Sequence, residues 1–271
     1  MKMNHIRYGS GKPLLLIHGL GGSWKSWIPV LDRLATHREV IAIDLPGHGK
    51  TPALKKGTIP ALADAVTRFL HNNNLTGIDA VGSSMGARIV LELARRGGVL
   101  GSVVSLNPGG FWQGWERHFF YNSLAASIRL LRGVKPLIPF LAGNAITRTI
   151  LLPQFSPTPW RLSPYLVVTE LQSYVATPVF NELLYALAYG EAQQGAKKGS
   201  ITKSLMIGWS RQDRICFPSQ ARKALTLFPD AHVYWFNGCG HFPHWDKPAE
   251  TSELILRVTA EPKMVEEKSI L

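Results

Sequence analysis

The chain has 271 residues, of which 45% are hydrophobic and 18% are charged, enough to bury a substantial core in one large domain or a domain with an insertion. No apolar run approaches the roughly 18 residues of a membrane span, and the first seven residues lack a hydrophobic signal region. The two cysteines, Cys216 and Cys239, are too few for a disulfide framework and fit a reducing compartment. We therefore expect a cytoplasmic protein without a stable membrane anchor.

The formal net charge of +12 comes from 30 basic and 18 acidic residues. The basic residues are scattered, apart from short pairs such as Lys55-Lys56, and no recognised nucleic-acid-binding module is present. We therefore predict a solvated basic surface and no nucleic-acid partner. A basic nucleic-acid-binding protein is an alternative hypothesis that no sequence motif supports. An acidic carrier protein as partner is left open, as is the oligomeric state.

Strand and helix patterns alternate along most of the chain. Short apolar segments bounded by Gly, Pro or polar residues predict strands at 4–8, 14–17, 40–43, 79–81, 102–106, 204–207 and 232–236. Helical spacing of apolar residues predicts helices near 24–35, 60–72, 86–96, 217–227 and 248–259. This order predicts an α/β fold, in which a mostly parallel central sheet is flanked by helices on both faces.

The alternation stops between about residues 110 and 199. This stretch is rich in aromatic and helix-forming residues, and seven prolines between Pro136 and Pro178 divide it into short segments. It predicts a mostly helical insertion, 110–199, into a core made of residues 1–109 and 200–271.

A Gly-x-Ser-x-Gly motif, Gly82-Ser83-Ser84-Met85-Gly86, lies between a predicted strand and a predicted helix. A strand that turns sharply into a helix through this motif is typical of the nucleophile elbow of hydrolases. The frame selects Ser84 rather than Ser83 as the exposed hydroxyl. The N-terminus of the following helix directs backbone donors towards negative charge that forms beside it.

With four further segments, the chain resembles α/β-hydrolase-fold serine hydrolases that are esterase-like and carry a helical cap. These segments are His18-Gly19-Leu20-Gly21-Gly22, Asp44-Leu45-Pro46-Gly47-His48-Gly49, Asp213 and Gly240-His241-Phe242. The resemblance spans nearly the whole chain and implies catalytic residues in the order Ser, Asp, His. It implies the fold more specifically than the substrate, because this fold supports many reactions.

The candidate catalytic residues are Ser84, His241 and Asp213. A serine hydroxyl needs a neighbouring base, and His241 in a Gly-rich loop is the candidate. Asp213, just after a strand, would orient the imidazole and stabilise its charged form. Some relatives carry this acid one strand earlier, but Asn107 stands in the corresponding segment and has no negative charge.

The resemblance also implies an oxyanion hole made by the backbone N–H groups of Leu20 and Met85. His18 is interpreted as a support of the loop rather than a base. Asp44 and His48 resemble a common structural turn of this fold.

Aromatic residues at the predicted ligand-binding edge of the sheet are candidates for the substrate pocket. They are Trp24, Phe111, Trp112, Phe217 and Phe242. Simple packing between cap and core is the alternative for each of them.

We expect a hydrolase that cleaves a small to medium, apolar carboxylic ester through an acyl-enzyme intermediate, without cofactor or metal. The same residues would serve a thioesterase, a lactonase or a carbon–carbon bond hydrolase. A hydrolase-fold ligand-binding receptor with little turnover is the alternative from another class. The serine disfavours haloalkane dehalogenases and epoxide hydrolases, whose relatives use aspartate at the elbow.

Overall fold

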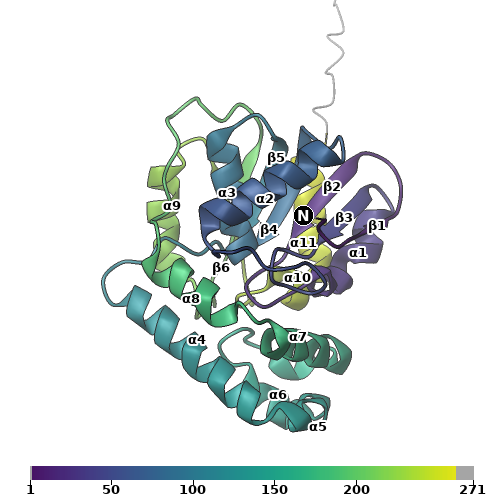
Figure 1. Ribbon diagram of the computed structural model, residues 1–271, viewed down its shortest axis with the longest axis vertical. Helices are drawn as coiled ribbons and strands as arrows, with labels where there is room; N and C mark the ends of the chain where they lie inside the picture. Colours follow the sequence, from purple (N-terminus) through teal and green to yellow (C-terminus); the bar gives the residue numbers. More distant parts are fainter. Residues whose placement is uncertain (1, 261–271) are drawn as a thin grey trace, which may run out of the picture.

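The computed structural model describes residues 2–260, so residue 1 and residues 261–271 of the predicted core lie outside the described part of the chain. Within residues 2–260, seven strands form one sheet in the order β1-β3-β2-β4-β5-β6-β7 (Figure 1). Among these described strands, the pairing of β1 with β3 is antiparallel and the other five pairings are parallel. The strands are β1 (His5–Tyr8), β2 (Pro13–Ile17), β3 (Glu39–Ile43), β4 (Ile78–Ser83), β5 (Leu100–Leu106), β6 (Leu205–Ser210) and β7 (His232–Phe236). The predicted mostly parallel α/β fold is confirmed.

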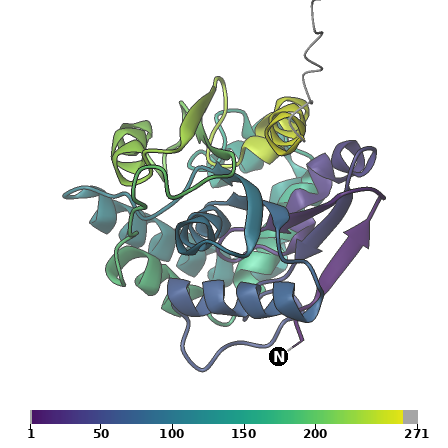
Figure 2. The same ribbon diagram turned by 90° about the horizontal axis from the view of Figure 1, so that it is seen from above.

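Two hydrophobic cores lie on opposite faces of this sheet, because successive side chains of a strand point to opposite sides. On β2, Leu14 and Leu16 belong to one core, whereas Leu15 and Ile17 belong to the other, and all four are fully buried. Burial of each such side chain contributes about 1.5–3 kcal/mol. The first core lies under α1 (Ile28–Ala35) and α11 (Pro248–Thr259), and the second under α2 (Ile59–Asn72), α3 (Met85–Arg96) and α9 (Ala221–Leu227) (Figure 2).

The helices predicted near 24–35 and 217–227 each begin with a short 3₁₀ turn. The first consists of η1 (Trp24–Trp27) followed by α1, and the second of η4 (Pro218–Gln220) followed by α9. The remaining short helix of the core is α10 (Pro243–Asp246). No helix among residues 2–260 is long and apolar enough to cross a membrane.

Between β5 and β6 the chain forms a layer of helices beyond the end of the sheet (Figure 1). We call α4 to α8 the cap layer. Proline occupies one of the first two positions of α5, η3 and α7, where its missing N–H has no helical partner to lose. The predicted boundaries, 109/110 and 199/200, fall in the segments that join this layer to β5 and β6. Its elements are α4 (Glu116–Gly133), η2 (Lys135–Leu137), α5 (Ile138–Gly143), α6 (Ala145–Leu151), η3 (Pro159–Arg161), α7 (Pro164–Ala176) and α8 (Phe180–Tyr189).

Hydrogen bonds join the cap layer to the core at several points, two of which involve α3 and the loop after β2. The buried guanidinium of Arg88, on α3, donates to the carbonyl oxygens of Leu187 and Glu191 at the end of α8. The hydroxyl groups of Ser173 and Thr177, at the end of α7, donate to the carbonyl oxygen of Gly21 at 2.7 and 3.3 Å. These contacts place the cap layer over the strand ends that carry the predicted site.

Candidate active site

Ser84 is the single residue between the end of β4 and the start of α3. Its backbone has φ 55° and ψ −111°, a conformation that a non-glycine residue rarely adopts. A Cβ at Gly82 would lie 2.2 Å from the carbonyl oxygen of Gly86, and a Cβ at Gly86 would lie 2.2 Å from that of Ile17. The two glycines are therefore required by the close approach of the backbone, and the turn projects the Ser84 hydroxyl away from the sheet.

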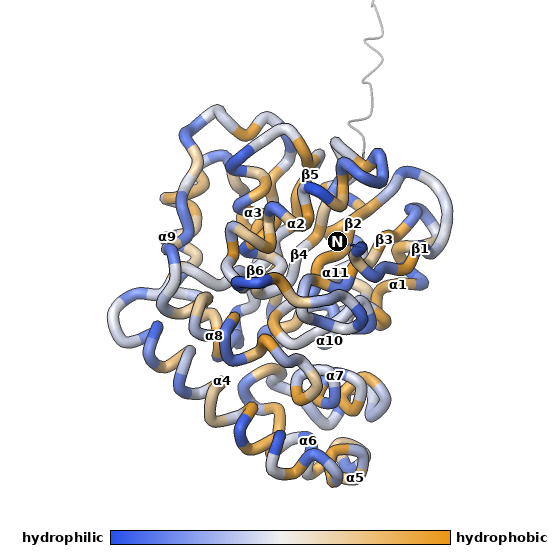
Figure 3. The backbone as a smooth tube through the Cα atoms, viewed as in Figure 1, coloured by the Kyte–Doolittle hydropathy of each residue, from blue (hydrophilic) through white to orange (hydrophobic). Residues whose placement is uncertain are grey.

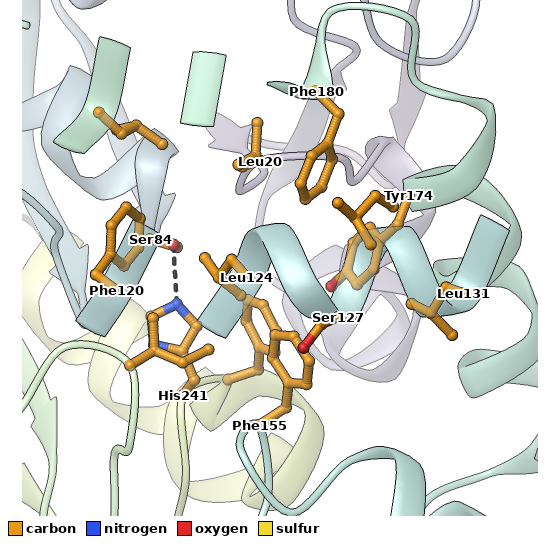
Figure 4. Close-up of a pocket in the computed structure, with 14 residues that line it drawn as sticks. Leu20, Ser84, Phe120, Leu124, Ser127, Leu131, Phe155, Tyr174, Phe180 and His241 are labelled. Carbon is orange, nitrogen blue, oxygen red and sulfur yellow. Dashed lines mark hydrogen bonds between the residues drawn. The ribbon is translucent and has the colours of Figure 1, made fainter. Parts of the chain in front are cut away.

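Ser84, His241 and Asp213 are joined by two hydrogen bonds. His241 Nδ1 lies 2.8 Å from Asp213 Oδ2. His241 Nε2 lies 2.9 Å from Ser84 Oγ, and this second bond is the dashed line in Figure 4. Because a carboxylate only accepts, the Nδ1–H donates to Asp213 and Nε2 accepts from the serine hydroxyl. Asp213 Oδ1 accepts from the backbone N–H groups of Ile215 and Cys216. All polar atoms of this carboxylate are thus engaged, which fixes its orientation towards the imidazole.

The loop that carries His241 is held by contacts from three sides. The N–H of His241 donates to the carbonyl oxygen of Phe155 at 2.7 Å, and that of Gly240 donates to the Asp246 carboxylate at 2.7 Å. A Cβ at Gly240 would lie 2.3 Å from the same Phe155 oxygen, so this position requires glycine. The segment between α6 and η3 therefore takes part in placing the imidazole.

Asn107 is the third support of this loop, a role that the sequence did not indicate. Its side-chain amide donates to the carbonyl oxygens of His241, Gly240 and to Ser210 Oγ, at 2.8, 3.1 and 2.9 Å. Its Oδ1 accepts from the N–H of Ser210 at 2.7 Å. Asn107 is fully buried at the end of β5, with φ 46°. It donates to the carbonyl oxygen of His241, which an amide can do and an ionised carboxylate cannot.

The backbone donors predicted for an oxyanion hole lie next to Ser84. Met85 is the first residue of α3, and Leu20 lies in the loop after β2 and lines the cavity beside Ser84. A Cβ at Gly19 would lie 3.1 Å from Ser84 Cβ, so this loop runs against the serine. Among the described residues, no acceptor engages the N–H of Leu20 or of Met85. Both donors are available to a ligand.

Two buried histidines hold the Leu20 loop. His18 Nε2 accepts from the N–H of Leu45, and His48 Nε2 accepts from the N–H of Gly21, both at 3.0 Å. Burial lowers the pKa of His18 to about 4 and that of His48 to about 3. Both are neutral at physiological pH and act as acceptors of backbone hydrogen bonds. Asp44 likewise accepts from the N–H of Trp24 and of Lys50.

An apolar cavity opens beside Ser84 and His241 (Figure 4). It is narrow: the volume that water can reach is about 40 Å³. One face of α4 forms a large part of its wall, because Phe120, Leu124, Ile128 and Leu131 recur at helical spacing. The other wall residues are Leu20, Ser127, Phe155, Tyr174, Phe180, Leu187, Ile215 and Phe242.

Of the five aromatic residues predicted for this pocket, only Phe242 lines the cavity. Phe111 is fully buried against Trp209 and Phe228 in the core. Trp112 packs behind the wall on Phe120, with ring centres 4.4 Å apart. Phe217 packs against Trp115 and Phe119 of the cap layer, and Trp24 lines a separate depression at the seam of core and cap. For these four, the prediction is corrected: they pack the core, support the wall or line another depression.

The sequence matches the Alpha/beta hydrolase family over residues 14–254, which is most of its length. The chain belongs to the alpha/beta hydrolase family. A curated relative from Cupriavidus necator, the dihydrolipoyllysine-residue acetyltransferase component of an acetoin cleaving system, is 28% identical over 94% of this chain. The match spans only 66% of that relative's length.

Solved structures place this alpha/beta hydrolase among proteins of the same fold. The enol-lactonase from Burkholderia xenovorans superposes with a TM-score of 0.76 at 17% identity, over 96% of both chains. A thermophilic esterase from Thermogutta terrifontis superposes with a TM-score of 0.71 at 19% identity, over 94% of this chain and 92% of the other. At such identities the likeness concerns the fold.

In this alpha/beta hydrolase, the one group of side chains among the described residues that could surround a metal ion shares two residues, Asp213 and His241, with the predicted triad. Ligand atoms of Asp213, Cys216 and His241 lie within 4.8 Å of one another. However, His241 Nδ1 and both Asp213 oxygens are already hydrogen-bonded. Burial, together with the charges of Asp213 and Glu116, raises the pKa of the Cys216 thiol well above its usual value. The donor set therefore suits proton handling better than metal binding.

Proposed function

We propose that this chain is a serine hydrolase that cleaves apolar carboxylic esters through an acyl-enzyme intermediate. The observation that carries the proposal is the hydrogen-bonded chain from Ser84 through His241 to Asp213, which faces an apolar cavity. We propose residues 110–199 as the cap that confers specificity.

In the first half of the reaction, Ser84 Oγ attacks the ester carbonyl carbon while its proton moves to His241 Nε2. The N–H groups of Leu20 and Met85 stabilise the resulting oxyanion. The bond from carbon to the alcohol oxygen then breaks, and His241 donates its proton to the leaving alcohol. Asp213 stabilises the imidazolium throughout.

In the second half, a water molecule attacks the acyl carbon and gives its proton to His241. The bond to Ser84 Oγ breaks, the serine recovers its proton, and the acid leaves. No electron transfer or co-reactant other than water is needed, so the proposed chemistry is complete with these residues.

The walls of the cavity favour an apolar acyl group. None of its lining residues is Lys, Arg, Asp or Glu, and its only hydroxyl groups besides that of Ser84 belong to Ser127 and Tyr174. A substrate with its own carboxylate would lose hydration without gaining a cation. Each buried methylene contributes about 0.8 kcal/mol to binding, so kcat/KM should rise up to about fourfold per methylene until the cavity is full.

Hydrolysis of three other types of bond would use the same residues, and a panel of substrates distinguishes these activities from ester hydrolysis. Esters, thioesters and lactones of matched acyl length, and a vinylogous diketone, are compared by kcat/KM. A preference for one of the last three would move the assignment to a thioesterase, a lactonase or a carbon–carbon bond hydrolase. Near-zero steady-state turnover after a stoichiometric burst would instead indicate the ligand-binding receptor.

The decisive experiment is labelling by a fluorophosphonate probe. Wild type should be labelled at one site, and Ser84→Ala should not be labelled. Ser83→Ala is the matched control. Ser83 is the preceding residue, and its hydroxyl is buried, so its removal should not change labelling. Labelling of Ser84→Ala at the wild-type level would contradict the proposal.

A further inference from the structure

The cap layer exposes most of the large apolar side chains at the surface of this chain. Twelve such side chains are exposed among residues 2–260, and ten of them lie between positions 115 and 185. Only Tyr8 and Leu225 lie elsewhere. Isolated exposed apolar residues are ordinary, but their concentration in one layer indicates a surface that meets an apolar partner.

The highest exposure is found at the end of the cap layer that lies farthest from the sheet. There α5 packs against α6 and α7, at the bottom of the view in Figure 1. Leu137, Phe140, Ile146 and Ile150 are 53%, 77%, 72% and 71% exposed. We call these four residues, on η2, α5 and α6, the distal surface. Apolar and polar residues are interspersed along this part of the chain (Figure 3).

The same part of the chain carries an unbalanced positive charge. Positions 117 to 169 hold six basic residues and no Asp or Glu, which accounts for half of the formal net charge of +12. Lys135 lies two positions before Leu137, and Arg161 lies in η3, which packs against α6; both are exposed. Exposed apolar side chains flanked by basic ones match the composition of segments that lie in the interface of an anionic bilayer.

We propose that the distal surface docks reversibly on an anionic lipid surface. The apolar side chains enter the headgroup region, and the basic residues contact the negatively charged headgroups. A second copy of the chain is a poorer occupant, because it would bring the same positive charge to the contact. Docking does not depend on the proposed ester hydrolysis.

The position of the cavity gives this docking a direction. Along the cavity wall, α4 places Phe120 near one end of the cavity and Leu131 near the other. The C-terminus of α4 continues into η2 and α5. The cavity thus runs along α4, the helix that leads to the distal surface. If the proposed function holds, an ester drawn from the lipid surface would have its acyl chain beside α4.

Vesicle flotation with the full chain tests the proposal. Phosphatidylcholine vesicles containing phosphatidylglycerol should bind wild type, pure phosphatidylcholine should bind weakly, and added salt should release the protein. Phe140→Ser/Ile146→Ser should lower partitioning at least tenfold. Lys135→Gln/Arg161→Gln should lower it about fivefold for each charge removed.

Matched controls use exposed residues outside the cap layer. Tyr8→Ser/Leu225→Ser and Lys55→Gln/Lys203→Gln should bind vesicles as wild type does. Fluorophosphonate labelling in detergent-free buffer, which reports the serine site alone, should be equal in all of these variants. Equal vesicle binding by the distal variants and wild type, or no binding by wild type, would overturn the proposal.

Two other outcomes would assign the surface to a different occupant. If the distal variants turn a dimer into a monomer in light scattering while vesicles do not bind, the surface is a contact between copies. If an acidic acyl carrier protein binds and vesicles do not, the partner is a protein. Either result overturns docking on lipid while leaving the serine chemistry untouched.

Discussion

The sheet core and the cap layer hold their functional residues by different forces. In the core, Asp213 and Asn107 each make several hydrogen bonds to backbone groups, and both are buried. In the cap layer, the cavity wall consists of side chains such as Leu124 and Phe180 that are held by apolar packing. Directional bonds fix distances within a few tenths of an ångström, whereas apolar packing tolerates changes of shape. Changes in the core should therefore affect turnover, and changes in the cap layer should affect which substrate is used.

The largest effect is expected from the core. Asp213→Asn should preserve the fold and lower kcat about 10⁴-fold, because an amide in this place favours the wrong tautomer of His241. The turnover number on one activated ester, with circular dichroism to confirm folding, provides the measurement. Turnover near that of wild type would exclude Asp213 as the triad acid.

A second variant tests whether an acid at position 107 could replace Asp213. Adding Asn107→Asp to Asp213→Asn should restore no activity and should destabilise the fold. A carboxylate there would face the carbonyl oxygens of Gly240 and His241, to which the amide now donates. Recovery of turnover in the double variant would contradict this account.

The seam between the two regions contains a buried carboxyl group. Glu170, on α7, is 2% exposed, and burial raises its pKa from 4.5 to about 8, an increase that its neighbours Ser26 and Tyr174 partly offset. The folded state therefore holds this proton more tightly than the unfolded state does. Its contribution to stability is complete below about pH 4.5 and is lost as the pH rises to about 8.

Glu170→Gln should remove this pH dependence. The free energy of unfolding of wild type should fall by a few kcal/mol between about pH 4.5 and about pH 8, and the variant should lack this share of the loss. Thermal or urea unfolding at both pH values measures it, and the exposed Glu253→Gln is the control. Parallel pH profiles of wild type and Glu170→Gln would contradict the assignment.

The smallest effect is expected from the cap layer and concerns selectivity. Leu131→Phe adds volume to the cavity wall and should lower the ratio of kcat/KM for octanoate over butyrate esters about tenfold. The rate on the butyrate ester should change little, because the change lies along α4, away from Ser84. Leu130→Phe is the matched control, since this neighbouring residue is exposed. A uniform loss on both esters would mean that the cap layer also sets turnover.

The sequence predicted the core well because its signals are local. Short apolar segments bounded by Gly, Pro or polar residues predicted the strands, and the Gly-x-Ser-x-Gly frame requires only five consecutive residues. The three residues of the proposed triad follow strand ends, and parallel strands bring such ends to one edge of the sheet. This explains why residues as distant in sequence as Ser84 and His241 could be predicted to meet.

The cavity wall was predicted poorly because it depends on how short helices pack. Aromatic type alone selected Phe111 and Phe217, although burial in the core and surface packing are equally good uses of an aromatic ring. The spacing of Phe120, Leu124 and Leu131 was visible as a helical stripe and was the available signal. The contribution of Phe155 and Tyr174 depends on tertiary contacts that no periodicity encodes, and the same holds for the bonds of Asn107 to residues 240 and 241.

The backbone of Gly21 connects the loop beside Ser84 to both the core and the cap layer. Its N–H donates to His48, and its carbonyl oxygen accepts the hydroxyl groups of Ser173 and Thr177 on α7. Leu20, the proposed oxyanion donor, is the preceding residue. If α7 were displaced, its hydrogen bonds to this carbonyl oxygen would be lost, and Gly21 would keep its bond to His48 in the core. The cap layer thus contributes to the placement of the proposed oxyanion donor as well as to the shape of the cavity.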